Sequence, residues 1–72
     1  MEVTERQESF IDILVSLMQE EEMIVGVALL LQTDNQMEQM VKFLEMNLQG
    51  EKLMIEDDQV LKKAIEISKQ VQ

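Results

Sequence analysis

The chain contains no cysteine, histidine, proline, tryptophan or tyrosine in its 72 residues. Without cysteine it cannot form disulfides, and without cysteine or histidine it lacks the usual zinc ligands. The absence of histidine, cysteine and tyrosine also removes most side chains that serve as catalytic bases or nucleophiles. We therefore expect no catalytic residue, no metal site and no cofactor, and we do not expect an enzyme.

Positive charge is also scarce. Six Lys and Arg residues stand against 15 Asp and Glu, which gives a formal net charge of -9, and Arg6 is the single arginine. Nucleic-acid binding depends on basic side chains that neutralise phosphates, and this chain has no basic cluster. Anionic lipid repels the same charge. We expect neither nucleic acid nor a membrane as a partner.

No hydrophobic run is long enough to cross a membrane. The most apolar stretch, MIVGVALLL at 23–31, would cover about 14 Å as a helix, whereas a bilayer span needs about 20 apolar residues. Residues 1–10, MEVTERQESF, lack the basic start and apolar core of a secretory signal. No linker or repeat divides the chain. We expect a single helical domain over 1–72, located in the cytoplasm.

Hydrophobic residues make up 46% of the chain, too many for a disordered protein, and their spacing predicts helices. From about 4 to 19 they fall on one broad arc that includes Phe10 and Ile11. The segment at about 21–32 is apolar on all sides, and we interpret it as a helix buried at the centre of the bundle, where Gly26 lets a neighbour approach. One continuous bent helix over 4–32 is the alternative.

Two later helices have clear beginnings. Thr33-Asp34-Asn35-Gln36 fits a capping box, and Gly50 fits the C-cap of the helix that follows. The last helix begins at the acidic residues 56–58, and the apolar connector 53–55 is expected to cover the bundle end. The predicted buried face of the third helix consists of Met37, Met40, Val41, Leu44 and Leu48. The predicted fold is all-α, a compact bundle of three or four short helices.

Two patterns resemble metal sites only superficially. The acidic clusters at 20–22 and 56–58 lack the spacing of a calcium-binding loop, so we interpret them as solvated helix starts. Met37 and Met40 could offer two thioethers on one helix face. Because no Cys or His stands beside them, we interpret them as packing residues.

Four residues are predicted to contact a partner. Phe43 and Met46 are large and apolar but fall away from the buried face of the third helix, so both are expected to point outward. Met40 on the same helix and Ile11 on the broad arc of the first helix complete the set. Seven methionines in the chain add adaptable contact surface.

The predicted function follows from size and charge. A chain this short hides only about 60% of its unfolded surface, so a second copy is the expected source of extra stability. Our hypothesis is a non-enzymatic, acidic protein–protein interaction module that forms a homodimer. The alternative is an acidic inhibitor or nucleic-acid mimic that occupies a basic groove on a target protein.

Overall fold

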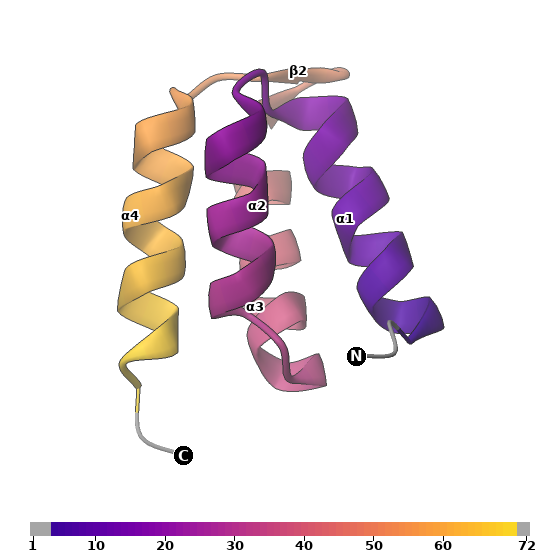
Figure 1. Cartoon of the computed structure of the whole chain (residues 1–72). Helices are drawn as coiled ribbons and strands as arrows, with labels where there is room; N and C mark the ends of the chain where they lie inside the picture. Colours follow the sequence, from indigo (N-terminus) through magenta and orange to yellow (C-terminus); the bar gives the residue numbers. More distant parts are fainter. Residues whose placement is uncertain (1–3, 71–72) are drawn as a thin grey trace.

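The computed structural model describes residues 4–70, which form a helical bundle capped by a small hairpin (Figure 1). In chain order the elements are α1 (Glu5–Leu17), α2 (Glu21–Leu30), α3 (Asp34–Met46), β1 (Leu48–Gln49), β2 (Lys52–Leu53) and α4 (Asp57–Ser68). Helix α2 packs against α1 and α4, and α3 packs against the same two helices from behind. The bundle of four helices is confirmed within these residues.

Local capping chemistry explains where α1 and α3 begin. The main-chain N–H of Gln36 donates to Thr33 Oγ1 at 3.2 Å, and the N–H of Thr33 donates to Gln36 Oε1 at 3.2 Å. This reciprocal pair is the predicted capping box. Thr4 and Gln7 form the same arrangement at the start of α1. At α4, the N–H of Glu56 donates to Gln59 Oε1 at 2.9 Å.

The segment 4–32 forms two helices, not one bent helix. Helix α1 ends at Leu17, the next residue Met18 has an extended backbone at φ -95° and ψ 157°, and α2 begins at Glu21. The sequence around this break contains neither Pro nor Gly. The predicted division into two segments, about 4–19 and 21–32, is confirmed.

The prediction for the end of the third helix is wrong. Helix α3 stops at Met46, and Leu48 pairs with Leu53 in an antiparallel hairpin. Gly50 has φ +65° in the turn of this hairpin, so it serves the turn and is not the C-cap. A glycine with positive φ suits both roles, so its presence alone does not distinguish a helix C-cap from a hairpin turn. The connector covers the bundle end as expected, because Leu53 and Ile55 pack against the core.

One apolar core fills the bundle, and within residues 4–70 it contains no buried polar or charged residue. Its members are Phe10, Leu14, Met18, Ile24, Val27, Leu31, Met37, Met40, Leu44, Val60, Ala64 and Ile67. Helix α2 contributes Ile24 and Val27 to it, but Val25 and Leu29 on its outer side are 50% and 60% exposed. The expectation that this helix is enclosed on all sides is therefore wrong for the single chain.

None of the helices in the described part of the chain combines the length and the apolar character needed to cross a bilayer.

Candidate functional site

Two of the predicted contact residues on α3, Met40 and Phe43, are covered in the structure. Met40 is completely buried, so it belongs to the core, and its prediction as a partner-binding residue is corrected. Phe43 is half-buried and packs against the core. Its ring lies beneath α4, with the Lys63 Nζ 5.5 Å from the ring centroid. Phe43 therefore does not point freely outward. Helix spacing alone could not show that α4 would cover it.

Met46 does point outward, with 84% of its surface exposed. It stands on the last turn of α3, one turn beyond Phe43. Since Phe43 is covered by α4 and Met46 is not, the two residues do not form the shared outward strip expected from the sequence. Met46 remains a predicted contact residue by itself.

Ile11 lies in a shallow groove between α1 and α2. It is half-buried, and the groove has a volume of about 140 Å³. The groove is lined by Gln7, Phe10, Ile11, Ala28, Leu29, Leu31 and Gln32. No charged side chain lines it, although the chain has a net charge of -9. An apolar surface without charge at its centre is typical of a protein interface.

Sequence reasoning missed the exposed ridge beside this groove. Val25 and Leu29 are one turn apart on α2 and both are at least half exposed. Leu29 also lines the groove. We call the ridge and the groove together the α1–α2 face. The sequence contained a sign of this exposed face: a short bundle cannot supply neighbours for every side of a helix that is apolar all round.

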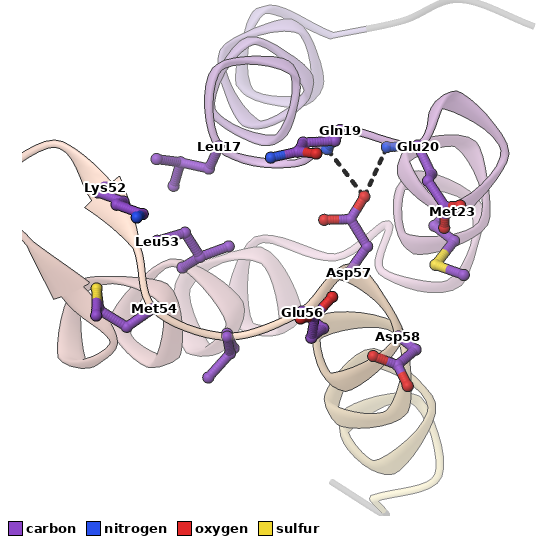
Figure 2. Close-up of a pocket in the computed structure, with 11 residues that line it drawn as sticks. Leu17, Gln19, Glu20, Met23, Lys52, Leu53, Met54, Glu56, Asp57 and Asp58 are labelled. Carbon is purple, nitrogen blue, oxygen red and sulfur yellow. Dashed lines mark hydrogen bonds between the residues drawn. The ribbon is translucent and has the colours of Figure 1, made fainter.

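A larger cleft lies at the end of the bundle, where the α1–α2 turn, the hairpin and the start of α4 meet (Figure 2). Its volume is about 780 Å³. Its apolar floor contains Leu17, Met23, Leu53 and Ile55, all half-buried, with the exposed Met54 beside them. Its charged rim contains Glu20, Glu56, Asp57, Asp58 and Lys52. We call this site the end cleft.

Asp57 builds the end cleft by joining two distant segments. Its Oδ2 accepts hydrogen bonds from the main-chain N–H groups of Gln19 at 2.8 Å and Glu20 at 2.6 Å (Figure 2). These N–H groups precede α2 and have no partner inside that helix. Asp57 therefore holds the turn between α1 and α2 against the first turn of α4.

The remaining charges of the end cleft are unpaired. Among residues 4–70 the ion pairs are Lys42–Glu38 and Lys63–Glu66, and neither involves the cleft. Glu20, Glu56 and Asp58 are exposed on the rim. In the same part of the chain no group of three or more acidic side chains converges closely enough to hold a metal ion. The cleft therefore combines an apolar floor with separate, solvated carboxylates.

No protein-family model, curated protein or solved structure matches this chain.

Proposed function

We propose that the protein is a non-enzymatic interaction module that forms a homodimer through the α1–α2 face. The observation that supports this proposal is the exposed ridge of Val25 and Leu29 beside an uncharged groove. Burying apolar surface stabilises an interface by about 25 cal/mol for each Å² removed from water. A chain of this size gains most from hiding such a face.

A second copy suits this face because the ridge and the groove lie on the same side of the molecule. In a two-fold dimer each copy offers the same surface, so the ridge of one copy can enter the groove of the other. Leu29 belongs to both features. The polar residues lining the groove are Gln7 and Gln32, so two acidic chains can approach here without placing carboxylates at the centre of the contact.

The non-enzymatic part of the proposal rests on the available side chains. The chain has no His, Cys or Tyr to act as a base or nucleophile. Two of its hydroxyl groups are occupied within their own helices: Ser16 Oγ donates to the main-chain oxygen of Asp12 at 2.8 Å, and Ser68 Oγ donates to that of Ile65 at 2.7 Å. A cytoplasmic location belongs to the same proposal, supported by the cysteine-free sequence.

Sedimentation of the full chain at low micromolar concentration tests the proposal. We expect twice the chain mass, and we expect Leu29→Glu to raise the dimer dissociation constant at least about tenfold, as a buried unpaired charge does. Met46→Glu adds the same charge at the predicted contact on α3, outside the α1–α2 face, and is expected to leave the dimer intact. A monomeric wild type would refute the homodimer. Dissociation by Met46→Glu and not by Leu29→Glu would move the interface to α3.

A further inference from the structure

We infer that the end cleft is a docking site for a basic amphipathic segment of another protein. The apolar side chains of that segment cover the cleft floor, and its lysines or arginines face the acidic rim. This site is separate from the proposed homodimer interface, because the end cleft and the α1–α2 groove share no lining residue. Either proposal can fail without the other.

The floor explains why the occupant carries apolar side chains. Leu17, Met23 and Leu53 pack against the core on one side but keep part of their surface open in the cleft. Met54 lines the same cleft and is 54% exposed. Methionine side chains adapt to the shape of a partner. The cleft is open to solvent, and its volume of about 780 Å³ leaves room for several side chains of a partner.

The rim explains why the occupant is basic. Glu20, Glu56 and Asp58 are exposed and take part in no ion pair among residues 4–70, and Lys52 is the single basic side chain that lines the cleft. Asp57 adds a fourth carboxylate, held in place by the α1–α2 turn. This excess of negative charge attracts a cationic partner and repels nucleic acid and anionic lipid.

The spacing of the carboxylates favours several separate cations over a single metal ion. No group of three acidic side chains converges to ligand distance in the described residues, whereas a bound Ca²⁺ needs at least about six oxygens around one point. A polyamine would match the charge but has no branched apolar side chains to cover the floor. A segment with alternating apolar and basic residues can cover the apolar floor and pair with the acidic rim at the same time.

Fluorescence anisotropy with a defined probe tests this inference. The probe is a fluorescein-labelled synthetic peptide of leucine and lysine in helical alternation, about 14 residues or four turns long, and glutamate replaces lysine in a control peptide. The double variant Glu56→Lys with Asp58→Lys is expected to weaken binding of the basic peptide at least about tenfold. Glu5→Lys with Glu8→Lys on α1 is the matched control: it makes the same change in net charge away from the cleft and is expected to weaken binding less than about twofold.

Met54→Ser tests the contribution of the floor. Because Met54 is exposed, this change is expected to leave the fold intact, and circular dichroism checks that. It is expected to weaken binding of the basic peptide about threefold or more. Equal losses in the two charge-reversed variants would overturn the inference, since the peptide would then sense only net charge. Displacement by spermine combined with no effect of Met54→Ser would also overturn it, since the cleft would then bind polycations without using its floor.

Discussion

The carboxylate of Asp57 accepts a hydrogen bond from the main-chain N–H of Glu20 across 37 residues of sequence, with an N–O distance of 2.6 Å. The same oxygen accepts from Gln19. A side chain at the start of α4 therefore holds the turn between α1 and α2. This contact ties the final helix to the first two and shapes the end cleft.

Replacing Asp57 by alanine should lower the free energy of unfolding by about 1–2 kcal/mol, because two main-chain donors lose a charged acceptor. Asp58→Ala is the matched control. It removes the same charge from the first turn of α4, so any loss of favourable interaction with the helix dipole is similar, but it breaks no hydrogen bond to the α1–α2 turn. Urea unfolding measures both variants. Equal losses would show that Asp57 acts only through the helix dipole.

The contrast between Thr33 and Asp57 shows what the sequence could predict. The start of α3 depends on Thr33 and Gln36, which are three residues apart, so the capping box could be recognised directly. The division near residues 18–20 was predicted from the acidic residues that begin α2, but the contact from Asp57 that holds this turn comes from a distant part of the sequence. The bundle was therefore predictable from local periodicity, whereas the end cleft was not, because it forms where three distant segments meet.

The position of Phe43 illustrates the same limit for surfaces. It was expected to point outward from α3, but it packs against the core, and Lys63 of α4 lies over its ring. Val25 and Leu29 show the reverse case, since α2 was expected to be enclosed and one of its sides is open. Periodicity identifies which residues share a face. It does not identify which face a neighbouring helix covers.

Gly26 offers a test of how closely α2 and α4 approach. A Cβ atom at this position would lie 3.4 Å from Leu61 Cδ1, which is close to ordinary contact distance. Gly26→Ala should therefore raise the free energy of unfolding by about 0.5–1 kcal/mol, since alanine favours a helix interior over glycine. Gly26→Leu should lower it by about 1–3 kcal/mol through overpacking. If the urea midpoints of the two variants shift in the same direction, the close approach of Leu61 to position 26 is contradicted.

Replacing Phe43 by alanine should destabilise the fold much more than replacing Met46 by alanine. Phe43→Ala is expected to lower the free energy of unfolding by about 1–3 kcal/mol, less than the 3–5 kcal/mol typical of a fully buried phenylalanine. Met46→Ala should change it by less than about 0.5 kcal/mol, because its side chain is almost entirely in solvent. Thermal and urea unfolding measure both. A large loss for Met46→Ala at a concentration where the chain is monomeric would contradict its exposed position.

The salt dependence of association distinguishes dimerisation through the uncharged α1–α2 face from binding through the acidic carboxylates. Each copy carries a formal net charge of -9, so two copies repel each other at long range while the uncharged groove holds them together. Raising the ionic strength from about 0.01 M to about 0.1 M shortens the screening length from about 30 Å to about 10 Å. The dimer dissociation constant should therefore fall as salt is added. Binding of the basic peptide to the end cleft should weaken over the same range, because there salt screens an attraction.

Sedimentation measures the dimer and anisotropy measures the peptide, in the same buffers. Leu29→Glu should associate weakly at every salt concentration, since added salt cannot restore the apolar ridge. A dimer that dissociates as salt rises would place charged groups at the centre of the contact. That result would exclude the α1–α2 face as the interface, because salt does not weaken an uncharged apolar contact.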